Sequence, residues 1–166
     1  GLKIYTTINS KMQNYAENAV RKHMKEFIQP SFFREQKGRK KAPYSDMLTF
    51  EQIKGILDKA MRESERYRVL KNEMNLSEKE IEKIFKKPVK TKVFSWNGDI
   101  DTVLSPYDSI KYTKHFLHSG LLSVEPGTGH VKAFVGGIDY RYFQYDHVIM
   151  QRRQVGSTFK PFLYTL

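Results

Sequence analysis

The residues best suited to chemistry are Ser157 and Lys160, in the string "RRQVGSTFKPFLYTL". On a helix, a spacing of three places both side chains on one face, one turn apart. A serine hydroxyl becomes a strong nucleophile when a base takes its proton, and a neutral lysine amine is able to act as that base. A lysine in water has a pKa of roughly 10.4, so the site must also favour the neutral amine, by desolvation or a cationic neighbour. The spacing predicts a nucleophilic serine with a lysine base.

The residues around this pair suit the same chemistry. Gly156 allows a sharp turn into the helix, and the backbone N–H groups of a first helical turn are free to stabilise an oxyanion. Phe159 and Phe162 supply apolar walls. Pro161 removes the N–H that would bond the Ser157 carbonyl, so we expect an irregular helix start. A Ser and a Lys at this spacing also occur by chance on helix surfaces, and it is the longer string "RQVGSTFKPF" that favours a site.

Other catalytic and metal chemistries have little support in the sequence. There is no cysteine, which excludes disulfides, cysteine-ligated zinc and thiol catalysis. The histidines show no metal-binding spacing, and His115 and His118 form a pair without a matching set of carboxylates. We therefore expect no metal and no cofactor.

The charge balance favours anionic partners. Lys and Arg number 29 against 18 Asp and Glu, a formal net charge of +11. Nucleic acid, a lipid surface and an acidic polymer all suit such a charge. A basic module that binds nucleic acid or another polyanion is therefore one alternative function, although no nucleic-acid motif or aromatic stacking pattern stands out. No apolar run reaches the length of a membrane helix, and the N-terminus lacks a signal-peptide pattern.

The first half of the chain is predicted to be mainly helical. Residues 2–8, "LKIYTTI", form a β-branched and aromatic run typical of a strand, and Asn9 or Ser10 then caps a helix that Pro30 ends. Residues 29–46 have no sustained period and are predicted to be a mobile basic loop. Capping boxes at "TFEQ" (49–52) and "SEKE" (77–80) each predict the start of a further helix.

The second half is predicted to contain two hairpins. Residues 89–96 alternate as a strand, "NG" (97–98) predicts a two-residue turn, and "DIDTVL" is the returning strand. Ser105 caps a helix that Gly120 closes. The segment "LLSVEPGTGHVKAFVGG" then predicts two strands around a tight turn. The fold class is α+β: helices with a small β-hairpin lobe, followed by the beginning of a sheet domain.

Three segments resemble one protein family. "RRQVGSTFKPFLY" resembles the active-site serine motif of class A penicillin-binding proteins, bifunctional enzymes that polymerise and cross-link peptidoglycan. "GLKIYTTINSKMQNYAENAV" is similar to the segment that leads into their transpeptidase region, and "VEPGTGHVKAFVGGIDY" resembles the hairpin before the serine. The middle, about 29–90, matches nothing so distinctive. Val155 departs from the pattern, because many relatives place Pro before the Gly.

The resemblance implies a domain division and a reaction. Residues 1–28 would enter the transpeptidase region, 29–104 would form a helical insertion with a small hairpin lobe, and 105–166 would be the N-terminal part of the transpeptidase domain. Ser157 would attack the penultimate carbonyl of a stem peptide ending in D-Ala-D-Ala, with Lys160 as the base, and an amine of a neighbouring stem would resolve the ester into a cross-link. β-Lactams would acylate the same serine. The parent protein would be membrane-anchored on the extracytoplasmic, periplasmic face, with peptidoglycan rather than nucleic acid as its partner.

Two elements that the family places after its serine have no counterpart after Ser157. They are S-x-N and K-T/S-G, and only six residues follow Lys160. Ser95-Trp96-Asn97 and Lys90-Thr91-Lys92 superficially match them, but both precede the serine, and we interpret them as accidental. We therefore expect a piece of a longer enzyme that is inactive alone and that self-associates through its apolar "FLYTL" end. A second alternative is another serine hydrolase with the S-x-x-K motif, such as a β-lactamase or esterase.

Overall fold

The computed structural model describes residues 1–165, which form an α+β fold, as predicted. The chain divides into two compact units. We call Lys22–Leu117 the middle unit, and Gly1–Arg21 together with the chain from His118 onward the terminal unit. The predicted domain boundaries at 28/29 and 104/105 stay a prediction. Within residues 1–165, no helix combines the length and apolarity that crossing a membrane requires.

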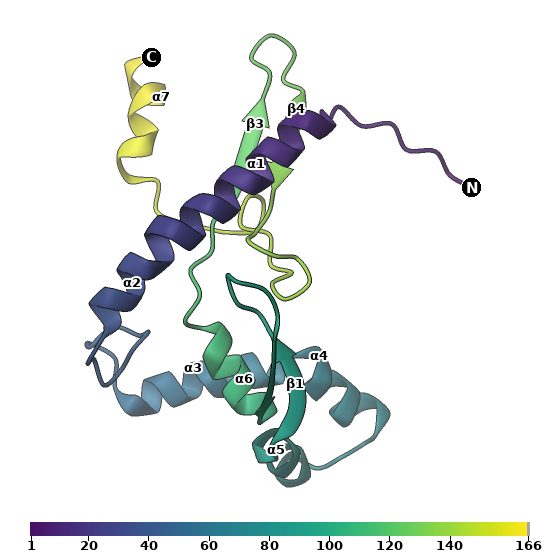
Figure 1. The fold of residues 1–166 in the computed structure, drawn as a ribbon, viewed down its shortest axis with the longest axis vertical. Helices are drawn as coiled ribbons and strands as arrows, with labels where there is room; N and C mark the ends of the chain where they lie inside the picture. The colour runs from purple at the N-terminus through teal and green to yellow at the C-terminus, as the bar shows by residue number, and fades with distance from the viewer. Residues whose placement is uncertain (166) are drawn as a thin grey trace. The chain divides into compact units, whose positions relative to one another are not determined.

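The elements follow one another as helices, a hairpin, a helix, a second hairpin and a terminal helix (Figure 1). In chain order they are α1 (Ser10–His23), η1 (Met24–Ile28), α2 (Gln29–Gln36), α3 (Phe50–Arg62), α4 (Glu65–Arg68), η2 (Val69–Glu73), α5 (Glu78–Lys86), β1 (Val89–Val93), β2 (Ile100–Leu104), α6 (Pro106–Thr113), β3 (Leu121–Val124), β4 (Val131–Val135), η3 (Gly156–Phe159) and α7 (Lys160–Tyr164).

The predicted end of the first helix at Pro30 is wrong. The π-helical turn η1 precedes Pro30, and the Gln29 N–H donates to the Met24 carbonyl within it. This shift of register places Pro30 in the first turn of α2, where a missing N–H costs nothing. The predicted basic loop over 29–46 is therefore wrong for its first eight residues, which form α2, and turns begin only after Gln36.

Capping explains where the other helices of the middle unit begin. The Thr49 hydroxyl accepts from the Gln52 N–H and the Gln52 side chain accepts from the Thr49 N–H, which confirms the first predicted capping box. The second box is confirmed as well, because the Glu80 carboxylate accepts from the Ser77 N–H at 2.9 Å. Each helix turns its apolar stripe inward, and the resulting core cluster consists of Met61, Leu70, Ile81 and Phe85.

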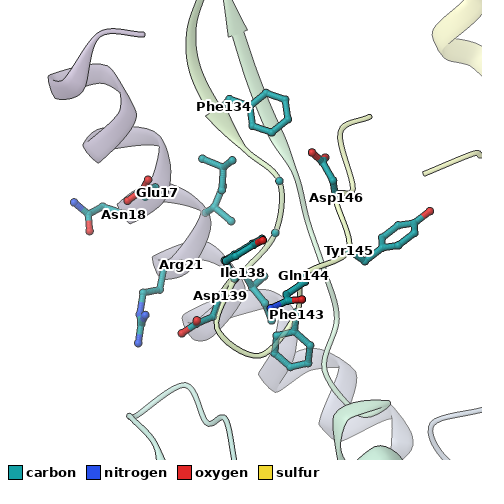
Figure 2. Close-up of a pocket in the computed structure, with 15 residues that line it drawn as sticks. Glu17, Asn18, Arg21, Phe134, Ile138, Asp139, Phe143, Gln144, Tyr145 and Asp146 are labelled. Atoms are coloured by element: carbon teal, nitrogen blue, oxygen red, sulfur yellow. The ribbon is translucent and has the colours of Figure 1, made fainter. Parts of the chain in front are cut away.

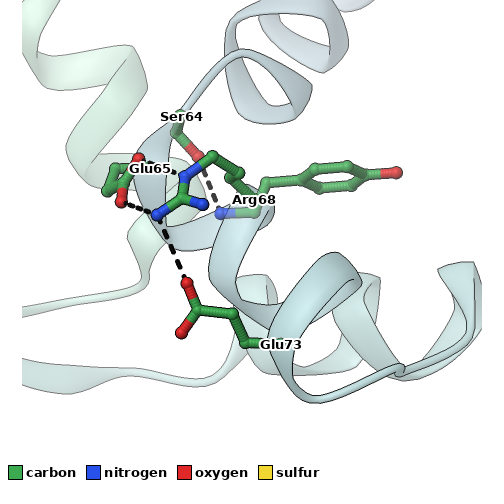
Figure 3. Close-up of polar contacts among 5 residues, drawn as sticks. Ser64, Glu65, Arg68 and Glu73 are labelled. Atoms are coloured by element: carbon green, nitrogen blue, oxygen red, sulfur yellow. Dashed lines mark hydrogen bonds and ion pairs between the residues drawn. The ribbon is translucent and has the colours of Figure 1, made fainter.

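A short helix, α4, joins α3 to η2. The Ser64 hydroxyl accepts from the Tyr67 N–H and so begins α4. Figure 3 shows the Arg68 guanidinium between two carboxylates: its Nε donates to Glu65 at 2.8 Å, and an Nη contacts Glu73 at 3.3 Å. These charges are solvent-exposed, so they fix local geometry more than they add stability.

The hairpin of the middle unit pairs β1 with β2 in antiparallel register, from Val89 opposite Leu104 to Val93 opposite Ile100. The connection is longer than the predicted two-residue turn. Six residues, 94–99, join the strands, and the Gly98 N–H donates to the Ser95 carbonyl. The longer loop allows Phe94 and Trp96 to be buried, with ring centroids 5.2 Å apart.

The helix after this hairpin begins as predicted and ends earlier. The Ser105 hydroxyl accepts from the Asp108 N–H and Pro106 occupies the first turn of α6. The helix stops at Thr113, so Gly120 does not close it. Gly120 serves close packing instead, because a Cβ built there would lie 2.8 Å from the Val148 side chain.

The terminal unit contains the second hairpin, in which β3 and β4 pair antiparallel as predicted, with an irregularity between Ser123 and Val124. The strand predicted over residues 2–8 does not form. Only its end reaches β4, where the Thr7 hydroxyl donates to the Val131 carbonyl at 2.8 Å. The segment before that point is an extended trace (Figure 1), and Leu2 is 90% exposed. A segment rich in β-branched and aromatic residues forms a strand only when it pairs with a neighbouring strand. Residues 1–165 supply no such partner for residues 2–8.

Candidate functional site

The predicted nucleophile lies in an irregular turn that begins the terminal helix. Gly156 has a φ of +52°, in the left-handed region that favours glycine, and it opens the 3₁₀ turn η3. Ser157 is the second residue of that turn, and Lys160 begins α7. The predicted irregular helix start is therefore confirmed, with Pro161 in the first turn of α7.

Both candidate catalytic side chains are exposed. Among residues 1–165, no group forms a hydrogen bond or ion pair with the Ser157 hydroxyl or the Lys160 amine. Phe159 and Phe162 have ring centroids 5.8 Å apart, but they are 47% and 66% exposed. Phe159 and Phe162, the apolar walls predicted for the lysine, therefore do not enclose a dry pocket around it. The roles of Ser157 and Lys160 stay predictions.

A separate cavity of about 570 Å³ lies in the same unit (Figure 2). One wall is the C-terminal half of α1, with Glu17 and Arg21, and the other is the loop that follows β4. Figure 2 shows Asp139, Phe143 and Asp146 on this loop. Its lining runs through residues 17–21 and 134–146, so it includes neither Ser157 nor Lys160.

The loop that lines the cavity is held by its own carboxylates. The Asp139 side chain is 7% exposed and accepts from the Arg141 guanidinium at 2.7 Å. This ion pair lowers the pKa of Asp139 despite its burial, which acts in the opposite direction. The Asp146 carboxylate accepts from the N–H groups of Val148 and Ile149, at 2.8 and 3.0 Å. The loop is therefore held by side-chain contacts at two positions, Asp139 and Asp146.

Gly136 allows the close approach of Asp146 that this arrangement requires. A Cβ on Gly136 would lie 3.2 Å from the Asp146 carboxyl carbon, and the Gly136 carbonyl accepts from the His147 N–H at 2.8 Å. Sequence reasoning missed both aspartates, Asp139 and Asp146.

The histidines of this unit pack as rings. His118 and His147 stack with centroids 4.9 Å apart and ring planes 11° apart, and Phe143 lies edge-on to His118 at 4.6 Å. Across the described residues 1–165, no three or more His, Cys, Asp or Glu side chains gather as a metal site would require. The His147 ring contacts Gln151 at 2.9 Å, so its role here is local packing.

The two upstream motif matches have structural roles of their own. Lys90-Thr91-Lys92 lies within β1. Ser95 belongs to the turn, where its hydroxyl donates to the Gly98 carbonyl at 2.6 Å and accepts from the Asn97 N–H at 3.2 Å. Both matches are part of the middle unit, whereas Ser157 is part of the terminal unit.

Comparison with known proteins identifies the family. Residues 39–117 match the model of the penicillin-binding protein middle domain, and the whole chain is similar to penicillin-binding protein 1A of several bacteria. The protein of Rickettsia felis is 30% identical over 182 residues and that of Rickettsia conorii 30% over 177, each match covering 99% of this chain. The chain belongs to the penicillin-binding proteins.

Within that family it is, more narrowly, a segment of a class A penicillin-binding protein. It spans 22% of the length of the Rickettsia relatives. Penicillin-binding protein 1A of Escherichia coli matches more closely over a shorter stretch, 45% identical over 49 residues, or 30% of this chain and 6% of the relative. No solved structure matches the chain.

Proposed function

We propose that Ser157 is the acylated nucleophile of a peptidoglycan D,D-transpeptidase, and that Lys160 is its general base. The observation that carries the proposal is the geometry at Gly156. Its positive φ begins a turn that places Ser157 at the start of a helix, with Lys160 three residues on. Membership of the penicillin-binding proteins supports the same reaction class.

The reaction proceeds in two halves. The Ser157 oxygen attacks the carbonyl carbon of the penultimate D-Ala of a stem peptide, while its proton passes to the Lys160 amine. The tetrahedral intermediate collapses, the peptide C–N bond breaks, and the terminal D-Ala leaves with a proton on its amine. An amine of a second stem peptide then attacks the Ser157 ester, forms the cross-linking amide and returns the hydroxyl to Ser157. A β-lactam enters the first half and leaves a stable ester.

We infer the setting of this reaction from membership of the family, which supports it. The whole protein acts on peptidoglycan at the extracytoplasmic, periplasmic face of the membrane, anchored by a segment that is not among these residues, and it carries a glycosyltransferase elsewhere. Within residues 1–165, Ser157 and Lys160 lie exposed without a third polar group. Since no third group orients or activates the pair, we infer that the 166 residues alone are not acylated.

Labelling of the whole protein with a fluorescent penicillin tests the nucleophile. Ser157→Ala is expected to abolish the covalent label. Thr158→Ala is the matched control, because it removes the neighbouring hydroxyl, which donates to the Val155 carbonyl, and it is expected to keep the label. A label that persists in Ser157→Ala, or that disappears equally in both variants, would refute the assignment.

Lys160→Met tests the base separately. We expect its acylation to be slower by at least about a hundredfold, a typical contribution of a general base, while the protein still folds. The rival assignment, a hydrolase of the β-lactamase or esterase type, is distinguished by the second half of the reaction. A transpeptidase transfers the acyl group to an added amine, and a hydrolase transfers it only to water.

The apolar side chains at the end of the chain support a further part of the proposal. Phe162, Leu163 and Tyr164 are 66%, 54% and 81% exposed. We expect the isolated 166 residues to self-associate through them. Gel filtration over a range of concentrations tests this, with Phe162→Ser and Leu163→Ser expected to restore a monomer.

A further inference from the structure

A groove of about 240 Å³ in the middle unit is lined by cations and apolar side chains. We call it the lysine groove: Lys40, Lys41, Ala42, Tyr44, Phe50, Ile53, Lys54, Leu57, Tyr107 and Lys111. Its four lysines come from three segments, the turns after α2, the first half of α3, and α6. Among the described residues that line it, none is acidic.

Most of the positive charge in the lysine groove is not compensated by carboxylates. The Lys54 amine pairs with Asp58 at 2.7 Å, so its charge is largely neutralised. The Lys41 amine donates to the Asp46 carbonyl, a neutral group, and lies 5.5 Å from the centre of the Phe50 ring. Lys40 and Lys111 form no ion pair with any carboxylate of residues 1–165. Three cations therefore remain to attract an anion.

The remaining lining gives the groove an apolar floor with one unsatisfied donor. Ile53 and Leu57 are buried beneath it, and Phe50 is 64% exposed at its edge. The Tyr44 hydroxyl is buried, and no group of residues 1–165 forms a hydrogen bond with it. A buried hydroxyl without a partner is unfavourable, so an acceptor that enters beside it is stabilised.

We propose that the lysine groove binds an acidic segment of a partner protein. Carboxylates of the segment contact Lys40, Lys41 and Lys111, one of them reaches the Tyr44 hydroxyl after a small shift of the ring, and one apolar side chain of the segment packs on the floor. Complementary charge favours this occupant, because three cations without a carboxylate partner line the groove. The apolar floor between them favours an apolar side chain in the middle of the segment.

The shape of the site favours a peptide over a membrane. A bilayer contacts protruding basic and apolar side chains, whereas these lysines come from separate segments and line one concavity. A concavity of this size accommodates a single side chain with polar groups on either side. That pattern matches an acidic peptide with one aromatic or aliphatic residue.

Fluorescence anisotropy with the whole protein in detergent tests the proposal. The probe is a synthetic, rhodamine-labelled peptide of sequence Glu-Glu-Phe-Glu-Glu. We expect binding that weakens as salt is added, and that weakens about tenfold in Lys40→Glu/Lys111→Glu, a loss typical of reversing charges at an interface. Lys22→Glu/Lys25→Glu is the matched control, because it changes the net charge equally at exposed positions outside the groove.

Two more experiments distinguish binding in the lysine groove from a general attraction to the net positive charge of the protein. Tyr44→Phe is expected to weaken binding a few-fold without lowering the melting temperature, since it removes a donor that has no partner in the free protein. A probe with Gly in place of Phe is expected to bind more weakly, because the floor stays empty. Circular dichroism of each variant checks that the fold is unchanged.

Three outcomes would overturn the proposal. The first is an equal loss of binding in the groove and control double variants, which assigns the effect to net charge. The second is no binding of the peptide to the wild-type protein. The third is binding of phosphatidylglycerol vesicles, lost in Lys40→Glu/Lys111→Glu, by a protein that ignores the peptide, which assigns the groove to lipid.

Discussion

The two units differ in how completely they bury their apolar side chains. In the middle unit Ile81, Phe85 and Phe94 are at most 2% exposed. In the terminal unit, Ile149 is 74% exposed and the aromatic side chains of α7 lie largely in solvent. The middle unit therefore has a well-buried core of its own, whereas the unit that contains Ser157 and Lys160 leaves large apolar side chains in solvent. The segment with the most distinctive sequence motif, around Ser157, is thus one that buries few of its own apolar side chains.

Each unit nevertheless contains the same local device, a glutamine amide that pairs with backbone. In the terminal unit, Gln13 donates to the Phe134 carbonyl and accepts from the Phe134 N–H, both at 2.8 Å. In the middle unit, Gln29 donates to the His115 carbonyl and accepts from the Leu117 N–H, both at 2.9 Å. Gln29 is 1% exposed, whereas Gln13 is only partly buried, so the same device works in two different environments.

Truncating one aromatic side chain in each unit gives the largest expected contrast. Phe85→Ala is expected to lower the free energy of unfolding of the middle unit by about 3–5 kcal/mol, because it opens a cavity in the core. Phe162→Ala is expected to cost less than about 0.5 kcal/mol, because that ring is 66% exposed. Urea unfolding monitored by circular dichroism measures both. Similar losses at the two positions would contradict the contrast.

Replacing the two glutamines by leucine should give the next largest difference. Gln29→Leu leaves the partly buried Leu117 N–H and His115 carbonyl unpaired beside a buried position, at a cost of about 3 kcal/mol. Gln13→Leu is expected to cost about 1 kcal/mol, since water reaches its site more easily. Thermal unfolding of the two variants side by side checks the order, and a larger effect at Gln13 would show that the edge of β4 matters more than burial.

Removing a helix cap from each unit has a smaller expected effect. Ser105→Ala is expected to lower stability by about 1 kcal/mol, because the Asp108 N–H in a partly buried turn loses its acceptor. Asn9→Ala is expected to cost about 0.5 kcal/mol, because its two acceptor contacts are solvent-exposed. Hydrogen exchange of the first-turn amides distinguishes the two helices, and Ser105→Thr is the control that keeps the hydroxyl.

The smallest expected effect is a dependence of the stability of the middle unit on pH. Burial, reinforced by Lys111, lowers the pKa of His115 from its ordinary value of 6.5. The unfolded chain then binds a proton at a higher pH than the folded one, so the stability is fully present above pH 6.5 and is lost as the pH falls toward the folded pKa. Urea unfolding at neutral and mildly acidic pH should show that the free energy of unfolding falls as the pH is lowered. The variant His115→Gln should remove this dependence on pH. An unchanged slope in that variant would assign the effect to another group.

Much of the middle unit was predictable because its signals are local. Both capping boxes, the Ser105 cap and the β1–β2 pair depend on residues a few positions apart. The predicted helix end at Pro30 was wrong because a π-helical turn, which has no sequence signature, precedes it. This turn shifts the register, so that Pro30 lies in the first turn of α2, where no N–H is needed. The turn at Asn97-Gly98 misled it because Phe94 and Trp96 leave the strand to be buried.

In the terminal unit, prediction succeeded for motifs and failed for long-range contacts. The β3–β4 hairpin and the irregular turn at Ser157 were evident from their glycines and proline. The strand over residues 2–8 failed, because strand propensity is realised only beside a partner strand. The Asp139–Arg141 pair and the Asp146 turn were missed, because their importance depends on the fold of the loop around Gly136.

The amide of Gln13 has a consequence for solubility. An unpaired strand edge is a template on which other chains add by backbone hydrogen bonding, and a two-stranded hairpin has two such edges. By occupying both backbone groups of Phe134, Gln13 places a helix where a foreign strand would otherwise dock. The β3–β4 hairpin is thereby protected on its β4 side from growing into an aggregate.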